Sequence, residues 1–330
     1  MKRILILHTG GTIGMNLQGA PDDVERFRKH VAQYAPRVFE TAHIDIEILS
    51  NKDSSDMTPL DWVRLAQALN ERMSKWDGFV VTHGTDTMSF TANALSFMMR
   101  NLPKPVILTG SQLPMADSKS DGPRNLIHAV EIAAESRVNE VGVLFDSFLL
   151  RGNRCKKTSI PSFHAFESPN FAPLAKLGVK IEYADLQPPR GDYTFDPRIE
   201  TRVLSIPLFP GIDVELLWAL TKTGVRGVVL QAFGPGDIPV SESSFVHWIR
   251  TLTERGIPTV ICSQAVYGAV DLSLYETGRG ARNAGAIGAG DMTWECSVVK
   301  MMILLGRGLP LAPFRAHFET NLAGELSAAP

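Results

Sequence analysis

The chain has 330 residues, of which 44% are hydrophobic and 21% charged, and its formal net charge is -2 at neutral pH. This length suffices for two domains, and the composition is that of an ordinary globular protein. The balanced charge argues against nucleic acid or an anionic membrane surface as the main partner, and no apolar run approaches the roughly 20 residues of a membrane span, so we expect a small-molecule ligand.

The N-terminus and the cysteines bear on the cellular compartment. Two basic residues precede an apolar run that covers only 4–7, whereas the apolar core of a signal peptide needs about 7–15 residues. We therefore expect a cytoplasmic protein. Cys155, Cys262 and Cys296 are odd in number and form no Cys-x-x-Cys pair, which favours neither a disulfide framework nor a zinc site.

The first predicted element is a buried strand that ends in a glycine turn. Residues 4–7 are consecutive apolar residues, too few for a helix, and Gly10, Gly11 and Thr12 follow shortly after them. This pattern is typical of a central strand in a parallel sheet. Thr12 then lies at the carboxyl end of a strand, where open α/β sheets bind their ligands. The alternative is that Thr12 only caps the segment that follows, and this stretch alone favours capping.

The next elements alternate between helix and strand. Apolar residues at helical spacing predict an amphipathic surface helix over 22–34, and alternating apolar and acidic residues predict an outer strand over 44–49. Thr58 as an N-cap and Pro59 at the first helical position predict another helix, with an apolar stripe down to Met73.

A second stretch repeats the design of the first loop. The apolar residues 79–81 lead to Gly84, and Thr85 and Asp86 follow it. Two such loops on one edge of a sheet would form a site. The alternative for Asp86 is capping of the helix predicted over 88–100, because a carboxylate there interacts favourably with the helix dipole.

Further alternation completes an α/β domain. Strands are predicted over 106–108 and 141–145, with a helix over 125–135 between them. Such alternation predicts a parallel sheet with helices on both faces. The stretch 187–192 is rich in proline, glycine and polar residues and has no periodicity, which predicts an interdomain linker.

The segment beyond the linker predicts a second, smaller α/β domain. Its expected elements are strands over 203–206, 225–230 and 259–262, helices that begin near Asp213 and Ser241, and a final helix near 293–305. We therefore expect an N-terminal doubly wound, mostly parallel α/β domain over residues 1–186, a linker over 187–202 and a smaller C-terminal α/β domain over 203–330.

Five motifs follow one another along the chain. They are Thr-Gly-Gly-Thr-Ile-Gly (9–14), Asp-Ser-Ser-Asp-Met-Thr-Pro (53–59), His-Gly-Thr-Asp-Thr-Met (83–88), Leu-Thr-Gly-Ser-Gln (108–112) and Arg-Gly-Asn-Arg-Cys-Lys-Lys (151–157). In order and spacing they closely resemble the bacterial-type L-asparaginases, and most of all the cytoplasmic type I branch. Residues 284–293 also fit, so the resemblance covers nearly the whole chain. It implies hydrolysis of L-asparagine to L-aspartate and ammonia through a threonine-linked acyl-enzyme.

Amide hydrolysis through a covalent intermediate needs a hydroxyl nucleophile, a group that takes its proton and donors for the oxyanion. The resemblance implies that Thr12 is the nucleophile and that Thr85, Asp86 and Lys157 cooperate with it. An ammonium near Thr85 would make its hydroxyl more acidic, whereas a desolvated lysine could itself act as a base. Without the resemblance, Lys157 and its basic neighbours would predict only a solvated rim.

A free amino acid must be held at its ammonium and at its carboxylate. Asp86 can bind the ammonium, and the hydroxyls of Ser54 and Ser55 can bind the carboxylate together with backbone N–H groups. The resemblance implies the same roles, with L-asparagine as the substrate. It also implies a homodimer or a homotetramer.

Other groups near the loops carry weaker signals. For His8 and His83 we favour hydrogen-bonded core residues over catalytic ones. The glycines over 285–290 precede no Gly-Lys-Ser/Thr, and no Gly-x-Gly-x-x-Gly follows the first strand, so a nucleotide is not expected. We expect neither a metal nor an organic cofactor.

One position departs from the family. Relatives carry a tyrosine in the loop after the first motif, where it hydrogen-bonds the nucleophile, but the matching residue here is Ala20 and the next tyrosine is Tyr34. A first rival function is therefore a non-catalytic or weakly active amino-acid sensor, although the retained site residues argue against it. A second rival is the amidase subunit of a tRNA-dependent amidotransferase, for which we expect an additional N-terminal domain, whereas the first strand here begins at residue 4.

Overall fold

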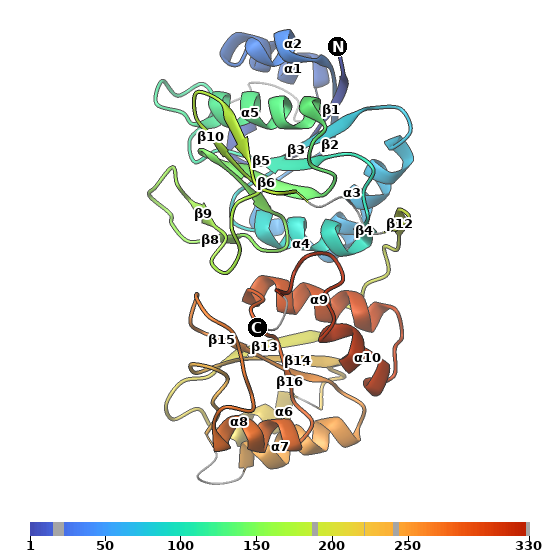
Figure 1. Cartoon of the computed structure of the whole chain (residues 1–330), viewed down its shortest axis with the longest axis vertical. Coiled ribbons are helices and arrows are strands. Elements are labelled where there is room, and N and C mark those ends of the chain that lie inside the picture. Colours follow the sequence, from blue (N-terminus) through green and yellow to red (C-terminus); the bar gives the residue numbers. More distant parts are fainter. Residues whose placement is uncertain (16–22, 187–190, 221, 240–243, 328–330) are drawn as a thin grey trace. The chain divides into compact units, whose positions relative to one another are not determined.

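The computed structural model describes residues 1–15, 23–186, 191–220, 222–239 and 244–327. The chain divides into two compact units, Met1–Pro197 and Arg198–Pro330. Each unit has its own sheet with helices on both faces (Figure 1). The α/β fold class is thus confirmed, with a larger N-terminal and a smaller C-terminal sheet.

The sheet of the N-terminal unit has eight strands in the order β11-β10-β7-β6-β5-β3-β1-β2. Their bounds are β1 (Arg3–Gly10), β2 (His43–Lys52), β3 (Gly78–Thr82), β5 (Val106–Thr109), β6 (Val141–Phe145), β7 (Phe148–Arg151), β10 (Ala175–Leu177) and β11 (Ile181–Tyr183). The strands from β2 to β6 pair in parallel, and β7, β10 and β11 pair antiparallel. Because β2 and β3 lie on opposite sides of β1, the winding reverses at β1, and such a switch point is where open α/β sheets bind their ligands.

The helices of this unit cover both faces of the sheet (Figure 1). They are α1 (Val24–Tyr34), α2 (Arg37–Thr41), α3 (Pro59–Arg72), α4 (Met88–Met98) and α5 (Gly122–Glu135). Helix α3 begins as predicted: the Asp61 carboxylate accepts hydrogen bonds from the backbone N–H and the hydroxyl of Thr58, at 2.9 and 2.7 Å. Phe27 of α1 and Leu126 of α5 are fully buried with Ile4 and Ile6 of β1 in one apolar core.

The predicted bounds of helices α4 and α5 were wrong. Helix α4 ends at Met98 rather than residue 100, because β4 (Met99–Arg100) pairs with β12 (Thr194–Phe195), which is distant in the sequence. Helix α5 begins at Gly122 rather than residue 125, and a proline stands in its first turn. Of the predicted linker, residues 187–190 lie outside the described residues, and the described part contributes β12 to the N-terminal unit.

The sheet of the C-terminal unit is parallel, with strands in the order of the chain. Its elements are β13 (Val203–Pro207), α6 (Val214–Leu220), β14 (Gly227–Ala232), α7 (Ser244–Glu254), β15 (Thr259–Ser263), α8 (Glu276–Asn283), β16 (Ile287–Gly288), α9 (Trp294–Gly306) and α10 (Leu311–Phe318). Strand β14 begins two residues later than predicted, the predicted start near Ser241 lies outside the described residues, and the helix predicted as final is followed by α10. A strand order without reversal leaves no switch-point crevice in this sheet, so the candidate site belongs to the N-terminal unit.

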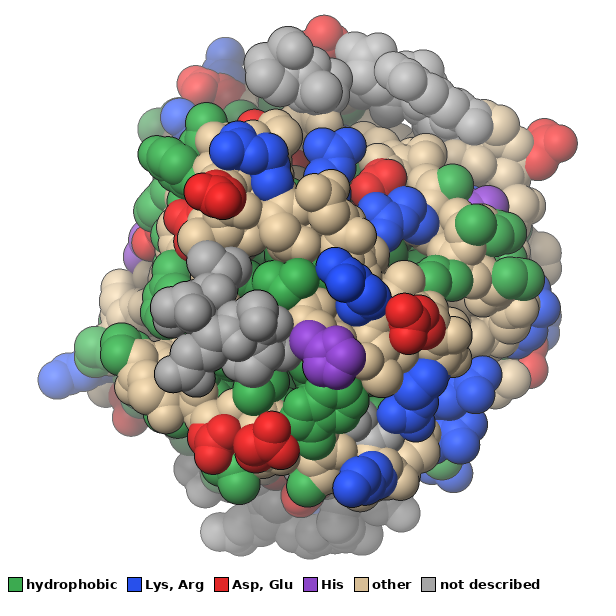
Figure 2. Space-filling view, turned by 90° about the horizontal axis from the view of Figure 1, so that it is seen from below, with side chains coloured by type: hydrophobic (Ala, Val, Ile, Leu, Met, Phe, Trp, Pro, Cys, Tyr) green, Lys and Arg blue, Asp and Glu red, His purple; other side chains and the backbone are tan. Residues whose placement is uncertain are grey.

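One face of the molecule shows how charged side chains are distributed on it. Basic and acidic side chains are interspersed on the face drawn in Figure 2, so this face has no extended field of one sign. Within the described ranges, no helix combines the length and the apolar character that crossing a bilayer requires.

Candidate active site

The loops after β1 and β3 touch each other through their glycines. A Cβ atom built on Gly11 would lie only 2.4 Å from the Cα and N atoms of Gly84. Gly11 also has a φ of +86°, which side chains of L-residues rarely allow. The two backbones can therefore approach this closely only because residue 11 is glycine. Thr12 and Thr85, which follow these glycines directly, are thereby brought to the same edge of the sheet.

Thr12 begins a single turn of 3-10 helix, Thr12–Gly14, and is partly exposed. The N-cap position of this turn is Gly11, and no side chain caps it. The structure therefore does not support the alternative that Thr12 merely caps the following segment. Its hydroxyl belongs to a residue on the ligand-binding edge of the sheet.

Lys157 bonds to two other predicted site residues. Its ammonium donates hydrogen bonds to Thr85 Oγ1 and to Asp86 Oδ1, both at 2.7 Å. Lys157 lies on β8 (Lys156–Lys157), which pairs antiparallel with β9 (Phe166–Glu167). Its side chain is only 18% exposed, so the alternative of a solvated basic rim is wrong for this lysine.

The capping role considered for Asp86 is also not supported. Helix α4 has Thr87 at its N-cap position without a side-chain cap, and the Asp86 carboxylate bonds to Lys157 instead. The Asp86 side chain is 66% exposed. The carboxylate is thus held by the lysine and remains open to a ligand.

The two serines differ in position. Ser54 is buried, its hydroxyl accepts a hydrogen bond from the Asp86 N–H at 3.3 Å, and a Cβ on Gly84 would collide with it. Ser55 is exposed, and both its N–H and its hydroxyl donate to Asp53 Oδ1 at 2.8 Å. These bonds hold the pKa of Asp53 below its ordinary value. The structure therefore joins Ser54 to the Thr85 loop, whereas the Ser55 hydroxyl is engaged by its own loop.

Both histidines next to the loops are buried. His83 uses both ring nitrogens, one with the Gly84 carbonyl at 2.7 Å and one with the Thr91 hydroxyl at 2.8 Å. His8 bonds through Nδ1 to the Thr82 hydroxyl at 2.7 Å. Burial lowers the pKa of each histidine to about 4, and single hydrogen bonds only partly oppose this shift. Both are therefore neutral at pH 7, as expected for core histidines.

Two further residues support the site and were given no role from the sequence. Gln112 donates from its side-chain amide to the carbonyls of Ile160 and Ser162, at 2.6 and 3.0 Å, and so ties down the β8–β9 hairpin that carries Lys157. The buried carboxylate of Asp121 accepts from the Gln112 N–H at 3.0 Å. The signal for Gln112 was present, because it closes the fourth motif.

Two positions bear on the tyrosine that relatives carry in the loop after the first motif. Ala20 lies outside the described residues. Tyr34 is the last residue of α1, and its ring packs edge-on against His30 with 4.9 Å between centroids.

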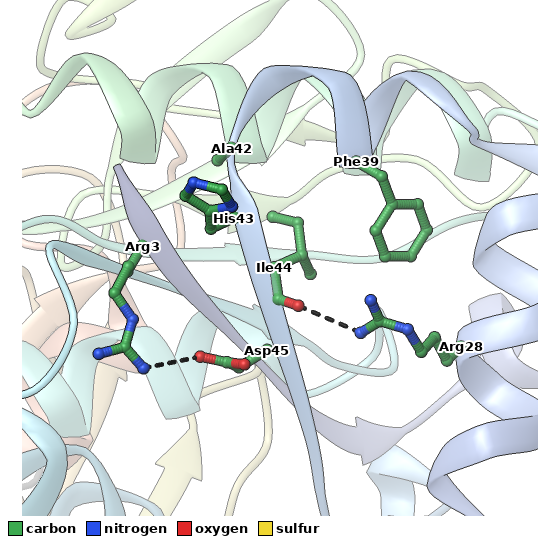
Figure 3. A pocket seen from close by; sticks show the side chains of 7 residues that line it. All are labelled: Arg3, Arg28, Phe39, Ala42, His43, Ile44 and Asp45. Atoms are coloured by element: carbon green, nitrogen blue, oxygen red, sulfur yellow. Dashed lines mark hydrogen bonds and ion pairs between the residues drawn. The ribbon is translucent and has the colours of Figure 1, made fainter. Parts of the chain in front are cut away.

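A pocket of about 360 Å³ lies elsewhere on this unit. Figure 3 shows its lining residues, among them Arg3 and His43. These two residues begin β1 and β2, whereas Thr12 follows the carboxyl end of β1. Its arginines are already engaged: Arg3 forms an ion pair with Asp45 at 3.2 Å, and Arg28 donates a hydrogen bond to the Ile44 carbonyl at 3.1 Å. It is therefore not the candidate active site.

No cluster of three or more His, Cys, Asp and Glu residues suited to a metal ion is present in the part of the chain that the structure describes. The three cysteines are buried and form no disulfide.

Comparisons of the sequence and of the structure with known proteins point to one family. The model of the family "Asparaginase, N-terminal" matches residues 3–188, and that of the "Glutaminase/Asparaginase C-terminal domain" matches residues 202–318. The chain is 37% identical to L-asparaginase 1 of Escherichia coli (strain K12) over 336 residues, which cover 99% of this chain and 98% of the relative.

Two solved structures are also similar. The thermostable L-asparaginase from Thermococcus kodakarensis superposes with a TM-score of 0.91 at 36% identity, covering 99% of this chain and all of that one. A probable cytoplasmic L-asparaginase from Campylobacter jejuni gives 0.82 at 26% identity, covering 97% of this chain and 100% of that one. With the fold, the joined loops and the full-length matches together, this chain belongs to the L-asparaginase family.

Proposed function

We propose that this protein hydrolyses L-asparagine to L-aspartate and ammonia through an acyl-enzyme on Thr12. One observation carries the proposal: a lysine from a distant hairpin bonds to Thr85 and Asp86 at 2.7 Å, beside the glycine contact that brings Thr12 to them. A hydroxyl nucleophile with an adjacent proton-transfer group is what covalent amide hydrolysis requires. Family membership and the full-length relatives support the substrate.

In the first half of the reaction, Thr12 Oγ attacks the side-chain amide carbon of asparagine. A C–O bond forms, the C–N bond breaks, and the hydroxyl proton of Thr12 ends on the departing nitrogen, which leaves as ammonia. Thr85 is suited to relay this proton, because its oxygen accepts from Lys157 and its own hydroxyl hydrogen is then directed elsewhere.

The pairing of Lys157 favours one of its two possible roles. Asp86 compensates the positive charge of the ammonium at 2.7 Å, and an ammonium so paired acts by polarising the Thr85 hydroxyl rather than by accepting a proton. In the second half, water attacks the ester carbon, Thr12 regains its proton and aspartate leaves. Lys157 and Thr85 serve both halves without a net change.

Substrate recognition follows from the exposed and buried groups of the same loops. We assign the substrate ammonium to the open carboxylate of Asp86 and the substrate carboxylate to Ser54, which is fixed against the Asp86 loop. Ser55 would join it only by giving up its hydrogen bonds to Asp53.

We also propose that the protein acts in the cytoplasm as a homodimer or homotetramer. The Campylobacter relative, described as a probable cytoplasmic enzyme, supports the compartment. The assembly rests on the resemblance to the type I branch, and light scattering of the purified protein tests it: a monomer mass would contradict it.

Ammonia release from free L-asparagine tests the function directly. We expect sustained turnover by the purified chain without added metal or nucleotide. Binding of asparagine without ammonia release would favour the amino-acid sensor. Release that requires an added tRNA-dependent partner would favour the amidotransferase subunit.

A further inference from the structure

His8 is a fully buried residue near the carboxyl end of β1, next to the two loops that carry Thr12 and Thr85. It lies on β1 opposite Thr82 of β3, and the two side chains share a hydrogen bond of 2.7 Å. Thr82 accepts a second bond at its carbonyl, from the Thr9 hydroxyl at 3.0 Å. The strand that leads to Thr12 and the strand that leads to Thr85 are therefore joined by side chains where they end.

The ring of His8 also fills the space below the turn Thr12–Gly14. A Cβ atom built on Gly14 would lie 2.7 Å from His8 Cε1 and 2.8 Å from Nε2. From the other side the ring packs against Phe27 of α1, with 4.3 Å between ring centroids. His8 is fully buried, so its ring has little room to retreat.

The His8 ring, and not the backbone conformation, is what requires glycine at position 14. Its φ is not in the left-handed region, where glycine is favoured, so alanine would fit the backbone conformation. The atoms that an alanine would meet below 3.0 Å are those of His8, whereas Phe27 lies 3.7 Å away. The turn therefore rests on the imidazole.

We propose that His8 is a positioning residue: its ring supports the Thr12–Gly14 turn from below, and its bond to Thr82 fixes that turn relative to Thr85. The inference rests on the proposed role of Thr12 and deepens it. A displacement of about 1 Å at a reacting group can cost roughly 10²-fold in rate, so a support of this kind acts on kcat. Burial lowers the pKa of His8 to about 4, so the neutral ring keeps one geometry across the neutral pH range.

A compensating pair of substitutions tests the support. Gly14→Ala should lower kcat about 10²-fold with a small change in KM, because the new methyl lifts the turn off the ring. His8→Asn keeps an atom that can bond to Thr82 and removes Cε1 and Nε2, the two atoms that the methyl would meet. The double variant should then be at least 10-fold faster than Gly14→Ala alone. A double variant as slow as the product of the two single effects would overturn the inference.

The bond to Thr82 has a separate test. Thr82→Val removes the hydroxyl and leaves the shape, and we expect kcat to fall several-fold while KM stays within twofold. An unchanged kcat would show that the bond does not position the loops. This variant also keeps the inference testable should His8→Asn fail to fold.

His30 provides a matched control and Thr12 separates the two claims. His30 is another buried histidine, on α1, and its ring packs edge-on against Tyr34. Among the described residues, no hydrogen bond joins His30 to Thr12–Gly14 or to Thr85. His30→Asn should lower stability but leave kcat unchanged, and an equal loss of kcat would reduce His8 to a general core residue. If Thr12→Ala is inactive but Gly14→Ala is not rescued by His8→Asn, the inference fails while the nucleophile stands. If Thr12→Ala stays active, the proposed nucleophile itself is wrong.

Discussion

Replacing Lys157 by methionine removes the ammonium and keeps most of the side-chain volume. In the folded protein this change breaks two hydrogen bonds of 2.7 Å, to Thr85 and to Asp86. Asp86 is 66% exposed, so water takes over its charge and the free energy of unfolding should fall by less than about 1 kcal/mol. Turnover should fall far more, since Thr85 loses the ammonium that polarises it, and a positioned proton-transfer group such as Thr85 contributes roughly 10²–10⁴-fold to the rate. We therefore expect a folded protein whose kcat is lower by about that factor.

The assay compares steady-state ammonia release with urea unfolding of the same preparations. Lys156→Met is the control, because it is the same substitution one position earlier on β8. Neighbouring residues of a strand point to opposite faces, so Lys156 points away from the side of Lys157. We expect the control to keep kcat within about threefold. Equal losses in both variants, or a Lys157→Met enzyme with nearly normal kcat, would refute the reasoning.

Three further predictions concern recognition, pH and stability. Asp86→Asn should weaken the binding of asparagine about 10-fold, roughly 1–2 kcal/mol. The turnover of succinamic acid, which lacks the α-amino group, should change much less. Equal losses of kcat/KM for the two substrates would contradict the role of Asp86. His8 and His83 have a pKa of about 4 in the folded protein, whereas the ordinary value is 6.5. Between these two pH values the unfolded chain binds more protons, so the free energy of unfolding should fall as the pH falls, by up to about 3 kcal/mol for each residue. A urea midpoint that stays constant from pH 7 to 4.5 would contradict this prediction. Lys300 and Glu325 form a fully buried ion pair at 2.6 Å. Glu325→Gln should lower the free energy of unfolding in urea by about 3–5 kcal/mol, because the ammonium loses its buried counter-charge. A loss below about 1 kcal/mol would show that the pair contributes little.

The parts of the fold that could be predicted were those with a local pattern. Short apolar runs before glycine turns located β1 and β3, and Thr58 with Pro59 located the start of α3. The end of α4 could not be predicted in the same way, because it depends on β12, nearly a hundred residues further along the chain.

Helix α8 was missed for a different reason. It contains Gly278 and Gly280, and glycine disfavours a helix by about 1 kcal/mol relative to alanine. A Cβ at Gly278 would press on the backbone of Leu272 at 3.0 Å. Tertiary packing therefore contributes to this helix, whose glycines disfavour it locally.

The candidate site shows the same division. Thr12 and Thr85 could be placed at one edge because each follows a predicted strand. Lys157 could be joined to them only through the family resemblance, since it stands 72 residues after Thr85 on a strand of two residues, too short for any pattern. Ser55 lies two residues after Asp53, and this local pair engages its hydroxyl.

The central claim is that Thr12 carries the acyl group. Acid quenching during asparagine turnover, followed by peptide mapping by mass spectrometry, measures which residue is acylated. We predict an aspartyl adduct on the peptide that contains Thr12, and in Thr12→Ala no adduct and at most a residual rate about 10³–10⁴ above that in water. An adduct on the peptide that contains Thr85, or ammonia release by Thr12→Ala close to that of the unmodified enzyme, would contradict the account.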